Sequence, residues 1–162
     1  MTRVALLEAL KKFIEDEIKD IKYPVSVQKG DEKARTKTPE VFKMRLPDSE
    51  SAKKIVPYII IQYVNGIDKQ SHSQRSESSC IIRIIFTTYS EDEQAGAIML
   101  MNLMDTVRLG LLKKVVIGGC FKLDTDAGLE DLIYNDDTAP YYAGEMVGTF
   151  ILPPIEREVS YE

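Results

Sequence analysis

The chain has no tryptophan, one histidine and two cysteines among its 162 residues. A Ser–His–Asp triad would depend on His72, which lies in a polar stretch, and an H-E-x-x-H zinc motif needs two histidines. The sequence contains neither a G-x-x-x-x-G-K-[ST] phosphate loop nor a G-x-G-x-x-G dinucleotide loop. We therefore predict a protein that is not an enzyme and that uses no metal and no cofactor.

Long apolar runs and paired cysteine motifs are also missing. No run approaches the roughly 18 apolar residues that a membrane-spanning helix needs, so we expect no transmembrane protein. The first residues enter an amphipathic pattern directly, which is not typical of a signal peptide. Cys80 and Cys120 lack a C-x-x-C spacing. They are expected to be small buried apolar residues in a reducing compartment.

Acidic charge is concentrated in the last quarter of the chain. Residues 121–162 hold two basic and ten acidic residues, a net charge of −8, whereas residues 1–120 carry +3. An acidic end does not hold phosphates, so sequence-independent DNA binding through it is not expected. Asp124, Asp126, Gly128 and Glu130 resemble part of a calcium loop, but they lack its third oxygen donor before the glycine. A turn with carboxylates facing water is the favoured interpretation.

Two stretches have helical periodicity. In residues 3–21 the apolar side chains recur at gaps of three and four, with Thr2 in position to cap the start. The second helix is expected over residues 91–112, after a capping box formed by Ser90 and Glu93. Its predicted core stripe consists of Ala97, Leu100, Met101, Met104, Val107 and Leu111. Further apolar residues, Ile98, Met99, Leu103 and Leu112, make it wider than a surface helix needs.

Strands are predicted where apolar and β-branched residues cluster or alternate. A short strand is expected at residues 25–27. An edge strand at residues 41–46 would carry Phe42, Met44 and Leu46 on one face. The stronger candidates are residues 55–64, 80–88, 120–123, 132–134 and 141–152. Gly144 and Gly148 within the last strand indicate a bend or a close backbone approach.

The order of these elements predicts one α+β domain over residues 1–162. A mostly antiparallel twisted β-sheet would carry two main α-helices on one face. Two polar segments interrupt this pattern: a loop or insertion at about residues 29–54 and a hairpin arm at about residues 65–79. The arm includes Asp68, Lys69, His72 and Arg75. We expect the arm to become ordered against a partner.

Two elements have more apolar surface than one domain is expected to cover. The strand at residues 80–88 is apolar on both faces except for Arg83, so both faces should be covered. With only two good helices available, part of that cover is expected from another chain. The candidate subunit-interface residues are Arg83, Ile85, Ile98, Met99 and Leu103.

Three blocks in this order resemble the tail terminator, or tail completion, proteins of tailed phages and phage-derived tail particles. The first is residues 57–61, followed by a polar loop with Gly66 and Asp68. The second is residues 87–92, followed by a long helix that contains residues 102–104 and 111–112. The third is residues 140–146, followed by residues 150–153. The resemblance covers about residues 1–20 and 55–157, and residues 29–54 have no counterpart in it.

The resemblance implies a structural virion protein with an α+β fold that closes into a six-membered ring. Such a ring caps the head-proximal end of the tail tube, stops tube polymerisation and presents a surface for head joining. The implied partners are other copies of the chain, the tail tube protein, and a head–tail connector, stopper or collar protein. DNA would pass through the channel without specific binding, and no membrane is involved. The resemblance also implies that the protein is assembled in the bacterial host cytoplasm and lies at the neck end of the virion tail.

Two expectations combine this resemblance with the charge pattern. Asp136 and Asp137 are candidates for lining or rimming the channel, where repulsion of phosphate would keep DNA from adhering. Three alternative functions remain open at the level of sequence. The protein could be a head–tail stopper or neck connector, a non-viral cytoplasmic ligand-binding α+β module with an enclosed pocket, or an enzyme that uses its carboxylates.

Overall fold

The computed structural model describes residues 1–27, 35–48, 52–71, 75–135 and 138–158. In these residues seven strands form one sheet in the order β3-β4-β5-β9-β7-β6, with β8 also paired to β9. The bounds are β3 Glu40–Lys43, β4 Tyr58–Lys69, β5 Glu77–Tyr89, β6 Val116–Ile117, β7 Phe121–Leu123, β8 Leu129–Ile133 and β9 Tyr141–Leu152. All pairings are antiparallel except β3 with β4, so the predicted α+β class with a mostly antiparallel sheet is confirmed.

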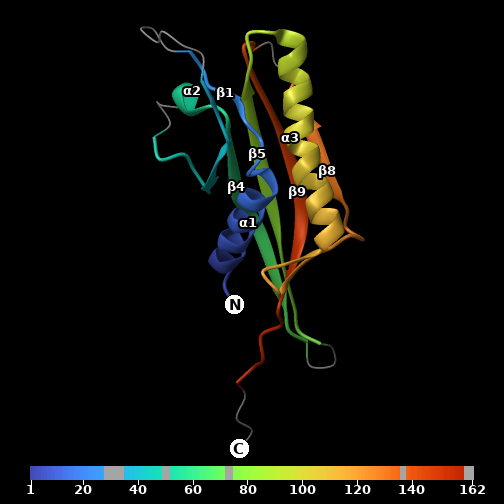
Figure 1. Ribbon diagram of the computed structural model, residues 1–162. Coiled ribbons are helices and arrows are strands. Elements are labelled where there is room, and N and C mark those ends of the chain that lie inside the picture. Colours follow the sequence, from blue (N-terminus) through green and yellow to red (C-terminus); the bar gives the residue numbers. More distant parts are fainter. Residues whose placement is uncertain (28–34, 49–51, 72–74, 136–137, 159–162) are drawn as a thin grey trace, which may run out of the picture.

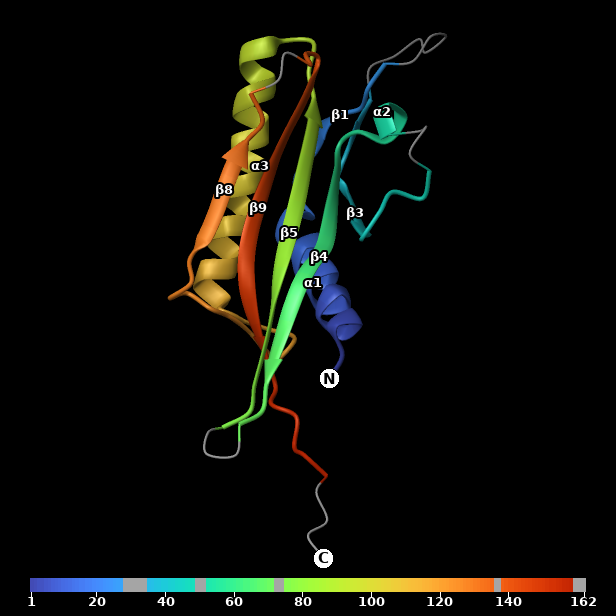
Figure 2. The same cartoon turned by 180° about the vertical axis from the view of Figure 1, so that it is seen from behind.

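Two long helices cover one face of this sheet (Figure 1). They are α1, Arg3–Ile18, and α3, Glu93–Lys114, and they contact each other as well as the sheet. Seen from behind, the strands β4, β5, β9 and β8 lie in front of both helices (Figure 2). The described part of the chain is therefore a two-layer structure, with helices on one side and a helix-free sheet face on the other.

The core lies between these layers because the strands alternate. On β5 the side chains of Ile82, Ile84 and Phe86 are fully buried against the helices. Their neighbours Ile81 and Ile85 point to the helix-free face and are half-buried. On β9 the buried side chains also occur at every second position, so the same alternation continues across the sheet.

The helix ends show where local chemistry differs from the prediction. Thr2 caps α1 as expected, since its hydroxyl accepts the Ala5 N–H at 3.1 Å. The helix ends at Ile18, three residues before the predicted end. The capping box at Ser90 is wrong, because Asp92 is the N-cap of α3. Its carboxylate accepts the N–H groups of the first turn, and a negative charge suits the positive end of the helix dipole.

The central hairpin is longer than its apolar residues predicted. Pairing of β4 with β5 continues to Lys69 and Glu77, so most of the polar segment at residues 65–79 is strand rather than loop. A bulge between Tyr63 and Asn65 interrupts the ladder and leaves Val64 as the extra residue. Polar side chains occur here because both faces of the hairpin end lie beyond the helical layer (Figure 1).

The start of β4 and the neighbouring edge strand also differ from expectation. The predicted strand at residues 55–64 begins only at Tyr58, because the chain before Pro57 forms the short helix α2, Ala52–Ile55. The edge strand β3 exists, but it runs parallel to β4. Its buried residue is Val41, whereas Met44 is 40% exposed, so the predicted inward face was wrong.

Two small elements complete the described chain. Strands β1, Tyr23–Pro24, and β2, Thr36–Lys37, pair with each other outside the main sheet. The expected strand at residues 25–27 is absent from the described secondary structure, which places the strand two residues earlier. On β9 the close approach predicted from the glycines is present, since a Cβ on Gly144 would lie 2.8 Å from the Met104 sulfur.

Helix α3 is long and apolar enough to cross a membrane by length and composition, with a mean hydropathy of 1.3 over 18 residues. Core helices of soluble proteins have the same property. Here one side of α3 packs against β5 and β9, with Leu100, Val107 and Leu111 fully buried. The opposite side of the helix remains outside this packing, and it contributes to the candidate site.

Candidate functional site

An apolar patch surrounds one ion pair on the helix-free face of the sheet. We call it the sheet patch and define it as Ile81, Arg83, Ile85, Glu145 and Val147, all half-buried. The alternation of β5 and β9 directs these five side chains to the same face. Arg83 Nε lies 3.0 Å from Glu145 Oε2, and the pair crosses from one strand to the other. The sheet patch is therefore apolar at its margins and charged at its centre.

Tyr134 connects this ion pair to the end of β8. Its N–H donates to the Ala143 carbonyl at 3.0 Å, which holds the residue beside β9. Burial raises the pKa of the Tyr134 phenol, and the charge and hydrogen bonding of Glu145 raise it further, while Arg83 acts in the opposite direction. At neutral pH the phenol is thus a hydrogen-bond donor toward the Glu145 carboxylate.

A second apolar surface runs along the outer side of α3. We call it the helix stripe and define it as Ile98, Met101, Asp105, Leu109 and Leu112. Its gaps of three and four residues place these side chains on one side of the helix. The four apolar members are 54%, 49%, 45% and 41% exposed. The outer side of a surface helix is ordinarily polar, so this stripe is unusual.

Asp105 of the helix stripe forms an ion pair with Arg108, which lies at the edge of the stripe. Arg108 Nε donates to Asp105 Oδ1 at 3.0 Å, one turn along the helix. Both side chains are partly exposed. The two surfaces thus share one composition, a cation and an anion beside large aliphatic side chains.

The predicted interface residues divide between these surfaces, with one correction. Arg83 and Ile85 lie in the sheet patch, Ile98 lies in the helix stripe, and Met99 is half-buried at the margin of the core face of α3. Leu103 is 0% exposed and belongs to the core. It lies five residues after Ile98, which is about 140° around an α-helix, so the side chain points into the fold. The prediction of Leu103 as an interface residue was wrong.

Sequence reasoning also missed part of the helix stripe. Met101 was placed in the core stripe, yet it is half exposed. Leu109, Asp105 and Arg108 were not singled out. The signal that would have found them was the spacing 98, 101, 105, 109 and 112, which is a second helical face opposite the core face.

The predicted arm residues lie near the tip of the β4–β5 hairpin. Asp68 Oδ2 accepts from Arg3 at 2.9 Å, and Asp68 Oδ1 accepts from the Ser78 hydroxyl at 2.6 Å, so Asp68 ties the hairpin to α1. Lys69 is the last residue of β4, and Arg75 is exposed shortly before β5. His72, like the candidate channel acids Asp136 and Asp137, lies outside the described residues.

The end of the described chain contacts the same hairpin. Arg157 donates to the Gln70 carbonyl at 3.0 Å, and Gln70 Nε2 donates to the Ile155 carbonyl at 3.5 Å. Residues 153–158 therefore continue from β9 past the hairpin end (Figure 1).

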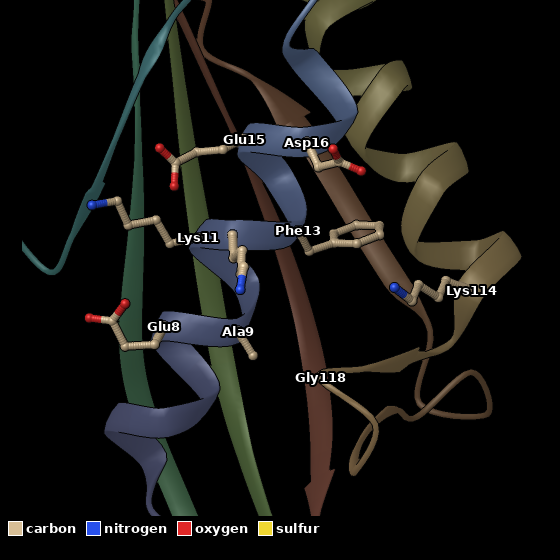
Figure 3. Close-up of a pocket in the computed structure, with 9 residues that line it drawn as sticks. Glu8, Ala9, Lys11, Phe13, Glu15, Asp16, Lys114 and Gly118 are labelled. Atoms are coloured by element: carbon tan, nitrogen blue, oxygen red, sulfur yellow. The ribbon is translucent and has the colours of Figure 1, made fainter.

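A surface hollow of about 700 Å³ lies between α1 and the end of α3 (Figure 3). Glu8, Lys11 and Glu15 point to one side of α1, whereas Phe13 points toward Lys114 on α3. The Lys114 ammonium lies 5.5 Å from the centre of the Phe13 ring. Cations and anions alternate around this open hollow instead of converging on a common point, so it lacks the arrangement of a small-molecule site.

A smaller hollow of about 360 Å³ is lined mainly by apolar groups. Its walls include Val56, Tyr58, Tyr141 and Ala143, and the Lys53 ammonium lies 5.5 Å from the centre of the Tyr141 ring. Among the described residues no group of three His, Cys, Asp or Glu side chains is placed to hold a metal ion. The Asp124 carboxylate instead accepts the N–H groups of Asp126 and Ala127, which is the geometry of a capped turn.

No protein-family model matches the chain, and no curated protein sequence matches it. A solved structure of a protein whose name states no function is similar, with a TM-score of 0.56 and 11% sequence identity. The match covers 97% of this chain and 99% of that one. At this identity the similarity shows a shared fold over nearly the whole length of both chains.

Proposed function

We propose that this protein is a structural subunit that assembles into a ring and caps the head-proximal end of a phage tail tube. The observation that carries the proposal is the presence of two apolar surfaces, the sheet patch and the helix stripe, on opposite sides of a two-layer fold. Contiguous exposed apolar surface marks interaction sites in soluble proteins. The resemblance in sequence to tail terminator proteins supplies the identity of the assembly.

Two different surfaces on opposite sides favour a head-to-tail contact. A two-fold dimer would use one self-complementary patch on each copy and leave the other patch exposed. A head-to-tail contact uses both patches on every copy, and it forms a closed ring when the rotation between neighbours closes. A ring of six copies is the expected closure for a particle that sits on a tail tube.

The partners follow from this position. One face of the ring would contact the last ring of the tail tube protein, and the other would contact a connector, stopper or collar protein. DNA would pass through the channel without specific contacts. The last quarter of the chain has a net charge of −8. If part of it faces the channel, it would repel the DNA phosphates and keep DNA from adhering.

The test is the mass of the purified protein, alone and after mixing with tail tubes assembled from the tube protein of the same genome. The proposal predicts a closed ring in negative-stain images and one ring at one end of each tube. Tubes polymerised in its presence should be shorter than tubes polymerised alone. A protein that stays monomeric in both conditions and leaves tube length unchanged would contradict the proposal.

The smaller hollow favours one alternative, a ligand-binding α+β module, because its lining is mostly apolar with a few polar groups. That function predicts a stable monomer whose melting temperature rises with a small apolar ligand. A head–tail stopper remains the alternative within the same class of assemblies. Locating the chain in a cryo-EM map of the particle separates the stopper from the terminator.

A further inference from the structure

We infer that the sheet patch of one copy packs on the helix stripe of the next copy, with the two ion pairs exchanging partners across the contact. In this arrangement Arg83 lies against Asp105 of the neighbouring copy, and Glu145 lies against Arg108 of the neighbouring copy. The inference rests on the proposed ring, and it names the contact by which the ring is built.

The sheet face that holds the sheet patch is long enough for the helix stripe to lie on it. From Ile98 to Leu112 the stripe extends about 21 Å at 1.5 Å per residue. On β5 the helix-free face extends about 27 Å from Ser79 to Thr87 at 3.4 Å per residue. A helix lying on a sheet face is also the contact that this fold already makes internally between α3 and its own sheet. A second sheet on the outer side of α3 would give this helix the two-sided cover that its apolar girth requires.

The charges are complementary as well. Each surface has one cation and one anion, held 3.0 Å apart. If either surface met only aliphatic side chains, its pair would lose water without gaining a partner, which is costly. When the two surfaces meet with opposite signs facing, each charge gains a second counter-charge and the four form an alternating cluster. Complementary charges of this kind fix the register and orientation of a contact more than they add affinity.

This alternation allows a test that preserves the ion pair within each copy. The first variant, R83E/E145R, exchanges the two charges of the sheet patch. The second variant, D105R/R108D, exchanges the two charges of the helix stripe. Each variant alone brings like charges together at the contact. The quadruple variant restores opposite charges, and an equimolar mixture of the two double variants restores them at every contact of an alternating ring.

The measurement is the fraction of ring by native mass spectrometry, with a circular dichroism melt of the monomer for each variant. We expect each double variant to weaken assembly at least about tenfold, since juxtaposed like charges disfavour the contact. The quadruple variant and the mixture should recover rings, and the mixture should contain equal numbers of the two chains. The matched control is D16K/K19D, which exchanges the two charges of the exposed Asp16–Lys19 ion pair at the end of α1. It should leave assembly unchanged.

Two outcomes separate the inference from the proposed function. If the wild type forms rings but the double variants also do, or the mixture fails to recover them, the contact named here is overturned while the ring stands. If the wild type forms no ring with or without tail tubes, the proposed function fails and the contact fails with it.

Discussion

Burial separates the two cysteines into different chemical environments. Cys80 lies on β5, faces the core and is 2% exposed, whereas Cys120 is half-buried next to β7. Burial raises the pKa of the Cys80 thiol above its ordinary value; the Asp68 charge adds to the increase, and the Arg3 charge opposes it. The thiolate is the reactive form, so Cys80 is doubly protected, by access and by protonation.

We expect one fast and one slow thiol when the native protein is treated with a thiol-reactive dye at pH 8. Cys120→Ser should abolish the fast phase, and Cys80→Ser should abolish the slow one. The raised pKa also favours folding as long as the thiol is protonated. This contribution is fully present below the thiol pKa of the unfolded chain and is lost as the pH rises through the pKa of the folded state. Equal rates for the two single-cysteine variants would contradict this assignment.

Leu103 lies in the core, whereas Ile98 lies in the exposed helix stripe. Leu103→Ala should lower the free energy of unfolding by about 2–5 kcal/mol, because it removes a fully buried side chain and leaves a cavity. Ile98→Ala should change the stability of the monomer by only about 0.5 kcal/mol, as for other exposed positions. In assembly the order should reverse, with Ile98→Ala weakening the ring. Urea melts of dilute protein measure the first effect, and mass photometry measures the second.

At the scale of elements, two glycines on the buried side of α3 meet different neighbours. A Cβ on Gly96 would lie 2.2 Å from Tyr142 Cε2, with two further ring atoms of the same tyrosine at 2.8 Å. A Cβ on Gly110 would meet only the carboxyl end of Glu17, at 2.9 Å. A flexible carboxylate can rotate away at small cost, whereas an aromatic ring packed between α3 and β9 has no such freedom.

The substitutions Gly96→Ala and Gly110→Ala should therefore have opposite signs. Alanine favours a helix interior over glycine by about 1 kcal/mol, so Gly110→Ala should raise the free energy of unfolding by up to that amount. Gly96→Ala should lower it, because the clash with Tyr142 outweighs the gain in helix propensity. Thermal melts of the two variants beside the wild type measure both. If both stabilise, the packing of Tyr142 across Gly96 is not what limits this position.

The elements whose own apolar periodicity specifies a buried face were predicted from the sequence. The elements whose structure depends on pairing with another strand were not. The two helices, the strand at residues 80–88 and the final strand at 141–152 were predicted because their apolar spacing alone specifies a buried face. The strand portions near Lys69 and Glu77 were missed, since polar residues pair there only because a partner strand is present. The parallel direction of β3 depends on a non-local pairing that no local pattern contains.

The candidate site was also predicted only in part. Arg83 and Ile85 were found because a charged residue interrupts a strand that is apolar on both faces. The outer stripe of α3 was only partly found, because an apolar helix with two apolar sides has no polar side to mark its orientation. Leu103 was misplaced for that reason. The choice between the two sides of α3 was made by packing against β5 and β9, which is tertiary information.

At the scale of the whole molecule, the fold buries the surfaces where the helices meet the sheet and leaves one surface of each layer exposed. The helices cover one sheet face, and their outer side and the bare sheet face remain available (Figures 1 and 2). The proposed ring would link folding to assembly, because it would bind only folded copies and so stabilise them by mass action. The stability of an assembling protein therefore depends on its concentration, whereas the stability of a monomer without partners does not.

The melting temperature of the wild type should therefore rise with protein concentration. In a closed ring each tenfold increase adds about 1 kcal/mol per subunit, which corresponds to about 2–4 °C for a chain of this length. The D105R/R108D variant keeps its own ion pair and core, so it should melt at one temperature across the same range, close to that of the most dilute wild type. Differential scanning fluorimetry over three decades of concentration gives both curves. A flat wild-type curve would show that the free protein does not associate. Rings would then have to form only on the end of the tail tube. In that case, adding tail tubes should raise the melting temperature of the wild type and leave that of the variant unchanged.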